Sequence, residues 1–242
     1  PQALVHLIIE ARCSYVFDFA MRAFEKNAEK DAFLAKFDLN LLLKMLDAPM
    51  EARAKFALTQ IKARFKTSDI SANHITRLFG NRHKFVREYA LDCMAANAEA
   101  YFANTELIAQ FMTGDDQTLR QWVGNSWAKI IAVWGDEKRQ VFLTRIVAFL
   151  MQCNHRSDTN RITHIIRLIS NDLSDTLKTL NIKVITDLLG HARAEISQFA
   201  AQIIKRQYEN QPDRLAQETL NLLLAHHDES VVTIGRELMR NI

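Results

Sequence analysis

Apolar and polar positions along this chain follow a unit that occurs several times. Each unit is an apolar run, a short polar turn, and a second apolar run with a small residue inside it. The clearest copies are ITRLFGNRHKFVREYALDCM (75–94), LIAQFMTGDDQTLRQWVGNSW (107–127), VITDLLGHARAEISQFAAQII (184–204) and TLNLLLAHHDESVVTIGRELM (219–239). LLLKMLDAPMEARAKFALTQI (41–61) is a fair copy, and residues 4–24 and 161–169 are poorer ones. Repeats of this form predict pairs of helices joined by short turns.

The spacing of the units supports the same interpretation. Aligned on the small or apolar residue of the second run, they lie 33 to 43 residues apart. The aligned residues are Ala20, Ala57, Ala90, Val123, Ile166, Ala200 and Gly235. Val86, Ala90 and Cys93 have the spacing i, i+4, i+7, which predicts one buried face on each second helix. A single hairpin cannot bury both of its faces, so we expect successive hairpins to stack, with the small residue allowing close approach.

Residues that favour helix ends fall near the predicted turns. Asp115, Asp116 and Asp228 precede second helices, where they would cap the first turn. Pro49 and Pro212 suit first-turn positions. The first helices end at Gly80, Gly114 and Gly190, where we expect left-handed backbone.

The second runs also carry a family resemblance. VREYA (86–90) has the V-R-x-x-A pattern, LRQWV (119–123) keeps its Arg, and EISQFA (195–200) and SVVTIG (230–235) keep the apolar frame. With the turn that contains Asp, this pattern resembles the HEAT repeat family over nearly the whole chain. The resemblance implies an all-α fold, a right-handed α-solenoid of about six to seven hairpins forming a single domain over residues 1–242. It also implies binding of macromolecules, not a reaction.

The composition of the chain bears on its fold class and on its cellular compartment. The chain has 242 residues, of which 48% are hydrophobic, and only three prolines and six glycines, which favours long helices. Its three cysteines form no CxxC pair and lie in apolar helical frames, which predicts inert thiols in a reducing, cytoplasmic setting. No apolar run approaches the roughly 20 residues of a membrane span. The chain starts at Pro1 inside an apolar run, so we expect it to be part of a longer protein.

Positive charge is concentrated in one window of the sequence. Residues 53–87 contain nine Lys and Arg residues and a single acid, Asp69, whereas the whole chain has a formal net charge of +3. The candidate binding residues are Arg53, Lys55, Lys62, Arg64, Lys66, Arg82 and Lys84. Arg87 and Arg120 fill the Arg position of the repeat, which usually supports neighbouring turns, so they are weaker candidates. The alternative interpretation is an ordinary solvated surface.

Aromatic residues and histidines form the other notable groups. Trp127 and Trp134 have the spacing of one helical face, and Trp122 points elsewhere. They could form an aromatic platform, but packing in the core is the favoured interpretation. Histidines recur at the turns, at His83, His155, His191, His226 and His227. Because successive turns are separated by about 8 to 10 Å, they are not expected to bind a metal.

Three functions remain open at this point. The leading one is a non-catalytic scaffold that binds a protein partner through the concave face of the second helices. The alternative is binding of nucleic acid through the phosphate backbone, at the basic patch of residues 53–87. The third, by analogy alone, is a HEAT-like DNA glycosylase that uses Trp122, Trp127, Asp115 and Asp116. No catalytic motif is found, and no cofactor is expected. Oligomeric state is left open.

Overall fold

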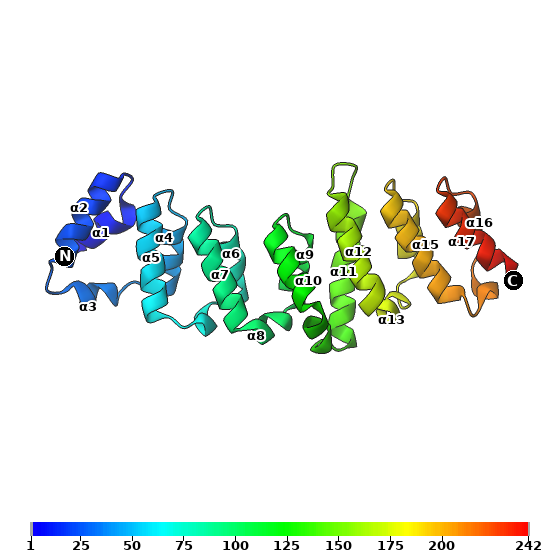
Figure 1. Cartoon of the computed structure of the whole chain (residues 1–242), viewed down its shortest axis with the longest axis horizontal. Helices are drawn as coiled ribbons and strands as arrows, with labels where there is room; N and C mark the ends of the chain where they lie inside the picture. The colour runs from blue at the N-terminus through cyan, green and yellow to red at the C-terminus, as the bar shows by residue number, and fades with distance from the viewer. Residues whose placement is uncertain (1, 242) are drawn as a thin grey trace. The chain divides into compact units, whose positions relative to one another are not determined.

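The chain is helical throughout the part that the structure covers. The computed structural model describes residues 2–241, and these residues form α-helices and two short 3-10 helices, without a strand (Figure 1). The prediction of an all-α fold is confirmed. Backbone contacts divide the chain into two compact units, Pro1–Tyr101 and Phe102–Ile242, where the sequence predicts one domain over 1–242. Among the described residues, no helix is long and apolar enough to cross a membrane.

The first unit consists of three packed helix pairs that follow one another in chain order (Figure 1). Its elements are α1 (Gln2–Glu10), α2 (Ser14–Glu25), α3 (Lys30–Leu34), α4 (Leu39–Leu46), α5 (Glu51–Arg64), η1 (Thr67–Asp69), α6 (Ala72–Phe79) and α7 (Lys84–Ala96). The pairs are α1 with α2, α4 with α5, and α6 with α7. The short helix α8 (Ala98–Phe102) contains the boundary between the units.

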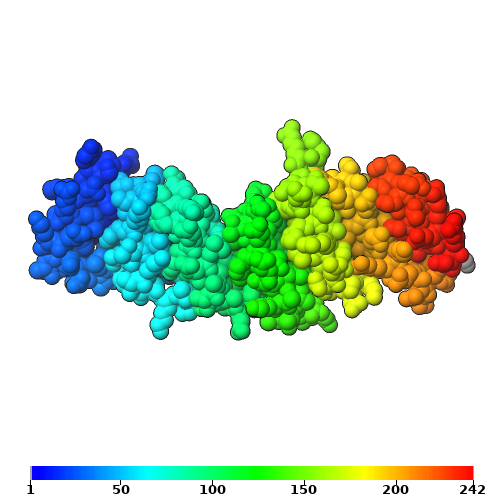
Figure 2. All heavy atoms as spheres, in the orientation of Figure 1, coloured from blue at the N-terminus to red at the C-terminus, as the bar shows by residue number. Residues whose placement is uncertain are grey.

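The second unit continues with longer helices. Its elements are α9 (Thr105–Thr113), α10 (Gln117–Ala132), α11 (Asp136–Gln152), α12 (Thr159–Asp172), α13 (Ser174–Leu177), α14 (Ile182–Leu189), α15 (Ala194–Tyr208), η2 (Pro212–Arg214), α16 (Gln217–Leu224) and α17 (Glu229–Arg240). Helix α9 packs on α10, α14 on α15, and α16 on α17. Helix α15 also contacts α12 and α17, so second helices lie beside one another. The turn between α11 and α12 projects beyond the neighbouring turns (Figures 1 and 2).

The aligned small residues lie where helices approach most closely. Ala20, Ala57, Ala90, Val123 and Ala200 are completely buried, and Gly235 is buried as well. A Cβ atom added at Gly235 would lie 3.0 Å from the Cβ atom of Leu223 on α16. Ile166 differs, because it is only half-buried while Ile165 on the same helix is completely buried. Six of the seven aligned positions are therefore buried, and Ile166 is turned partly toward solvent.

Aspartates cap two second helices as predicted. The Asp116 carboxylate accepts from the amides of Thr118 and Leu119 at the start of α10. The Asp228 carboxylate accepts from the amide of Ser230 at the start of α17. Asp115 does not cap, because its carboxylate pairs with Arg161.

The two prolines differ from each other. Pro212 is the first residue of η2, as expected for a first-turn proline. Pro49 lies outside its helix, because α5 starts at Glu51 and its N-cap is Met50.

The glycines after the first helices do not adopt the predicted left-handed backbone. Gly80, Gly114 and Gly190 directly follow α6, α9 and α14, with φ of −69°, −69° and −74°. No residue in the described range has positive φ. The Gly80 amide instead continues the helical hydrogen bonding to Thr76. Close approach explains the glycine at 114, because a Cβ atom there would lie 2.9 Å from the Gln110 carbonyl oxygen.

Enlarging a small residue between packed helices should destabilise the fold. Ala90 on α7 is completely buried, so Ala90→Leu should lower the free energy of unfolding by about 1 to 3 kcal/mol through overpacking. Ala95 is exposed on the same helix, and Ala95→Leu is the matched control, expected to stay within about 0.5 kcal/mol. Urea unfolding followed by circular dichroism measures both. Equal stability of the two variants would contradict close packing at Ala90.

Asp228 should make stability depend on acidic pH. Hydrogen bonds from Ser230, and then from Gln198 on α15, lower the pKa of Asp228 from 3.8 to about 2. Because the folded-state pKa is the lower one, the stabilisation is present above pH 3.8 and is lost as the pH falls toward 2. Asp228→Ala should cost about 1 kcal/mol at neutral pH, as for other N-caps. Thermal unfolding from pH 7 downward should show the difference between variant and native chain disappearing at acidic pH, and a constant difference would disprove the assignment.

Candidate functional site

Two of the seven candidate basic residues support the fold of the first unit. Arg53 is half-buried, and its Nη1 donates to the carbonyl oxygens of Ile9 at 2.6 Å and Ala11 at 3.1 Å, at the end of α1. Arg64 donates to the carbonyl oxygens of Leu34 and Ala35 at the end of α3. Helix C-termini leave carbonyl groups without an internal partner. These two guanidinium groups satisfy such carbonyls, so they are not free for a ligand.

The lysines of the same set lie on the surface beside acids or aromatic rings. Lys55 pairs with Glu51 at 2.6 Å, and Lys84 pairs with Glu88 at 3.3 Å. Lys62 Nζ lies 5.2 Å from the ring centre of Tyr89 on the next second helix. Lys66 and Arg82, the remaining members of the set, are exposed.

Acids next to the window 53–87 neutralise part of its positive charge. Four acids flank residues 53–87 directly in sequence, namely Asp47, Glu51, Glu88 and Asp92, and reduce the formal charge of +8 by half. Asp47 pairs with Arg77, and two of the other acids pair with the lysines described above. Arg87 donates to the carbonyl oxygens of Asn81 and Arg82, in agreement with a role in supporting a turn. The structure therefore does not favour this window as the main binding surface.

The tryptophans are part of the core of the second unit. Trp127 and Trp134 are 4% and 2% exposed, and both rings contact Phe142. Trp127 Nε1 donates to the Asp172 carboxylate at 3.0 Å, and Trp134 Nε1 donates to the Phe102 carbonyl at 2.6 Å. The packing interpretation is confirmed for this pair.

Trp122 is half-buried against Phe102 and Phe111. The glycosylase hypothesis needs Trp122, Trp127, Asp115 and Asp116 to face a common ligand. Trp127 is buried, Asp116 caps α10 and Asp115 pairs with Arg161, so the structure does not bring the four together around an open site.

Two turn histidines, His83 and His191, lie at hydrogen-bond distance from carbonyl oxygens of the preceding turn, Ala48 and Cys153. His191 Nε2 donates to the Cys153 carbonyl at 3.0 Å, 38 residues earlier, while its Nδ1 accepts from the Arg193 amide. Asn81 makes the equivalent bonds, from Nδ2 to the Leu46 carbonyl and from its Oδ1 to the His83 amide. His226 and His227 stack on each other. Within residues 2–241, no three His, Cys, Asp or Glu side chains lie close enough together to hold a metal.

The cysteines are unpaired, and two of the three are buried. Burial raises the pKa of the Cys93 and Cys153 thiols, which opposes formation of thiolate. Cys13 differs from the prediction, because it is exposed and directly precedes α2.

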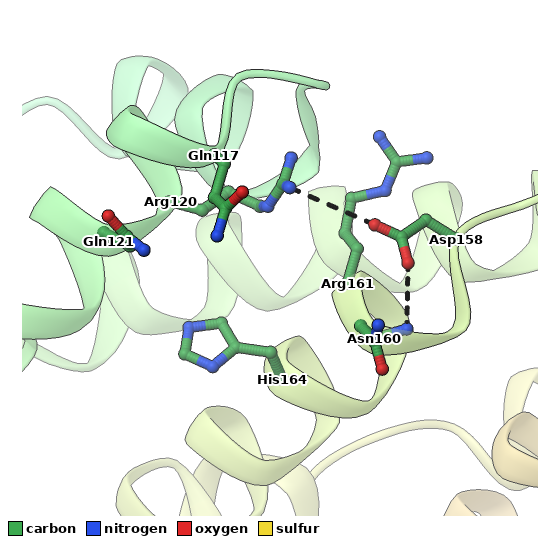
Figure 3. Close-up of a pocket in the computed structure, with 7 residues that line it drawn as sticks. All are labelled: Gln117, Arg120, Gln121, Asp158, Asn160, Arg161 and His164. Atoms are coloured by element: carbon green, nitrogen blue, oxygen red, sulfur yellow. Dashed lines mark hydrogen bonds and ion pairs between the residues drawn. The ribbon is translucent and has the colours of Figure 1, made fainter.

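A groove of about 260 Å³ opens between two second helices, α10 and α12. Gln117, Arg120 and Gln121 line it from α10, and Asp158, Asn160, Arg161 and His164 line it from the start of α12 (Figure 3). His164 points from α12 toward α10, where a Cβ atom added at Gly124 would lie 3.4 Å from its Nε2. The side chains of Gln117, Gln121 and Asn160 make no hydrogen bond within the described residues.

Charged side chains of both signs line this groove. Arg120 Nη1 donates to the Gly114 carbonyl, and its Nη2 lies 4.0 Å from Asp158. Arg161 Nη1 donates to the Thr113 carbonyl, and its buried Nε has no hydrogen-bond partner among the described residues. Burial lowers the pKa of His164, and the charges of Arg167 and Arg120 lower it further. The imidazole therefore lies in a positive potential.

A second groove of about 450 Å³ lies on the other side of α12, between α12, α15 and α17. Its floor includes Ile166, Phe199 and Ile234, and its rim includes Gln202 and Arg206. Ile166, the aligned residue that is only half-buried, opens into this groove.

The sequence contains a signal for these grooves. The residue two positions before each aligned small residue is polar in every unit and is exposed or half-buried. These residues are Asp18, Lys55 and Glu88 in the first unit, and Gln121, His164, Gln198 and Thr233 in the second. The change from charged to uncharged side chains indicates the second unit, in which the two grooves are found.

Comparisons with known proteins identify no family. No protein-family model matches the sequence, and no curated protein matches it. Among solved structures, the crystal structure of an engineered protein covers 99% of this chain and 95% of its own, with 17% sequence identity and a TM-score of 0.32. A TM-score of that size supports no conclusion about a shared fold.

Removing Arg53 should affect stability more than removing an exposed lysine. Arg53→Ala leaves the carbonyls of Ile9 and Ala11 without their donor, and should cost about 1 to 3 kcal/mol in free energy of unfolding. Lys66→Ala removes one positive charge at an exposed position and should cost less than about 0.5 kcal/mol. Chemical denaturation of the two variants measures the difference. If both variants were as stable as the native chain, Arg53 would return to the set of available surface residues.

Proposed function

We propose that this chain is a right-handed α-solenoid of about six to seven HEAT-like hairpins that binds a protein partner without catalysing a reaction. Support for the repeat arrangement comes from hydrogen bonds that link several second helices and turns to the preceding hairpin. Arg53, Asn81 and His191 donate to carbonyls 35 to 44 residues earlier in the chain. These separations are close to the repeat spacing of the sequence, as expected for a stack in which each hairpin contacts its neighbours.

One observation carries the functional proposal. The second helices of the second unit expose uncharged hydrogen-bonding side chains, and two grooves separate these helices. The side-chain amides of Gln117, Gln121, Asn160 and Gln202 make no hydrogen bond within the described residues. Gln198 and Gln207 differ, because they donate to Asp228 and to the Leu177 carbonyl. Carboxamides both donate and accept, as does the backbone of a partner protein. Grooves with polar rims and some apolar floor are typical of binding sites for partner segments.

The nucleic-acid alternative has less support. Of the seven candidate residues in the window 53–87, Arg53 and Arg64 bind carbonyls within the unit, and Lys55 and Lys84 pair with acids. Lys62, Lys66 and Arg82 are the exposed members with no ion pair among the described residues. Binding of phosphates would require several unpaired cations along one track.

Selection from a library of random peptides displayed on phage tests the proposal. The immobilised chain should enrich peptides whose affinity falls at least about tenfold for a Gln121→Ala, Gln202→Ala double variant, because each lost carboxamide bond contributes about 1 kcal/mol. The matched control is Lys183→Ala with Asp187→Ala on the first helix α14, which leaves the net charge and both grooves unchanged. Failure to enrich any peptide, or equal loss in both variants, would overturn the proposal.

A parallel titration examines the alternative. Labelled single- and double-stranded DNA and RNA are titrated with the chain at salt concentrations from about 50 to 300 mM. We expect no binding at the upper end of this range. Tight binding that weakens steeply with salt and disappears on charge reversal of Lys62, Lys66 and Arg82 would favour nucleic acid instead.

A further inference from the structure

We infer that this chain forms a two-fold symmetric dimer through the exposed side of α2, in the first helix pair of the first unit (Figure 1). This inference goes beyond the proposed function, because it concerns a second copy of the chain and a different surface. All the exposed large apolar residues that the structure describes in the first unit lie on this one helix. They are Tyr15, Val16 and Phe19, which are 86%, 38% and 65% exposed.

In the other units, the position of Phe19 is covered. The residue directly before each aligned residue is aromatic or Ile in all seven units. In the six later units this residue is buried or half-buried, and those residues are Phe56, Tyr89, Trp122, Ile165, Phe199 and Ile234. The ring centre of Phe56, for example, lies 6.4 Å from that of Phe17 on the preceding second helix. Helix α2 therefore exposes an apolar position that elsewhere packs in the fold.

Helix α7 shows what covers two such rings. Lys55 Nζ lies 5.9 Å from the ring centre of Phe85, and Lys62 Nζ lies 5.2 Å from that of Tyr89. Both lysines belong to α5, the neighbouring second helix. A cation over an aromatic ring is attracted by the electrons of the ring. Aromatic residues at these two positions are thus covered by cations from another helix.

Tyr15 and Phe19 occupy the corresponding positions on α2, five and one residues before its aligned alanine. Neither ring has an aromatic or cationic partner within the described residues. The other end of the same helix carries Arg22 and its C-cap Lys26, which are exposed and form no ion pair within that range. Positions 15, 19, 22 and 26 follow the helical period, so the rings and the cations share one face.

An antiparallel contact between two α2 helices brings these groups together. About a two-fold axis, positions that face each other always have the same sum, and 15 with 26 and 19 with 22 meet this condition. Tyr15 of one copy then faces Lys26 of the second copy, and Phe19 faces Arg22. Because a two-fold interface is self-complementary, each contact is made twice. The face of α2 thus supplies to a second copy the cations that its own rings lack.

The charges on α2 permit this approach. Asp18 and Glu25 are exposed on the same helix and balance the two cations, so the helix with its C-cap has no net formal charge. Head-to-tail contact with α17 of another copy suits the face less well. The exposed Met239 of α17 is followed directly by Arg240, which would bring a further cation toward Arg22.

Sedimentation equilibrium of the full chain tests this inference. The native chain should show a monomer–dimer equilibrium with a dissociation constant in the micromolar range, as for a small interface. Phe19→Arg should weaken dimerisation at least about tenfold, because like charges then meet at Arg22. Adding Arg22→Glu to that variant should restore dimerisation, since each arginine then faces a carboxylate. Leu222→Arg, at an exposed apolar position on α16, is the control and should dimerise like the native chain.

The same charge exchange can be made at the other contact, with Tyr15→Arg alone and together with Lys26→Glu. Because Tyr15 and Phe19 are exposed, all these variants should keep the circular dichroism spectrum of the native chain. A chain that stays monomeric up to about 100 µM would overturn the inference and leave the face of α2 to another partner. Assemblies larger than a dimer, or a dimer unaffected by Phe19→Arg, would place the contact elsewhere. Loss of the dimer that neither charge exchange reverses would contradict the antiparallel pairing.

Discussion

The arrangement of helices in each unit depends on satisfying the carbonyl groups at the ends of the first helices and in the turns that follow them. These groups have no partner within their own helix, and leaving them buried without a donor costs about as much as a lost hydrogen bond. In this chain the donors come from the next hairpin, for example Arg53 to the end of α1 and Arg193 to the turn after α11. Each hairpin therefore needs its neighbour for polar as well as apolar reasons.

Because these carbonyl groups need donors from the next hairpin, several arginines of the chain stabilise the fold. Arg193 is almost fully buried and donates to the carbonyls of Asn154 and Ser157 and to the Thr159 hydroxyl. Arg161 bonds the turn after α9 in the same way. A guanidinium suits this role because it offers five donors in a rigid plane and stays charged. Counting arginines along the sequence therefore overestimates the charge that a ligand would meet.

The same bonding leaves one side of the second helices exposed. One side of each second helix is buried, as at Ala200, and the polar residue two positions before the aligned residue is exposed or half-buried. Exposed residues of successive second helices are brought near one another by the stacking, although they lie more than 30 positions apart in the chain. Side chains on this exposed side can change without disturbing the core.

The sequence by itself determined the helical fold class, the caps of α10 and α17 and the buried stripe. These features are local, since periodicity, N-caps such as Asp116 and small residues such as Ala90 act through positions a few residues away. It did not determine which polar residues are free. Arg53 and Lys66 look alike in sequence, yet one bonds carbonyls 42 and 44 residues earlier and the other is exposed.

Only the tertiary structure decided that Gln121 and His164, 43 positions apart, line one groove. It also decided that Glu51 and Glu88 pair with lysines of the window 53–87 and so neutralise part of the positive charge of that window. Left-handed glycines at the turns were expected and are absent from the described residues, because the turns continue helical hydrogen bonding. Which side chains stay exposed is set by contacts between helix pairs, and the pattern within one pair does not contain that information.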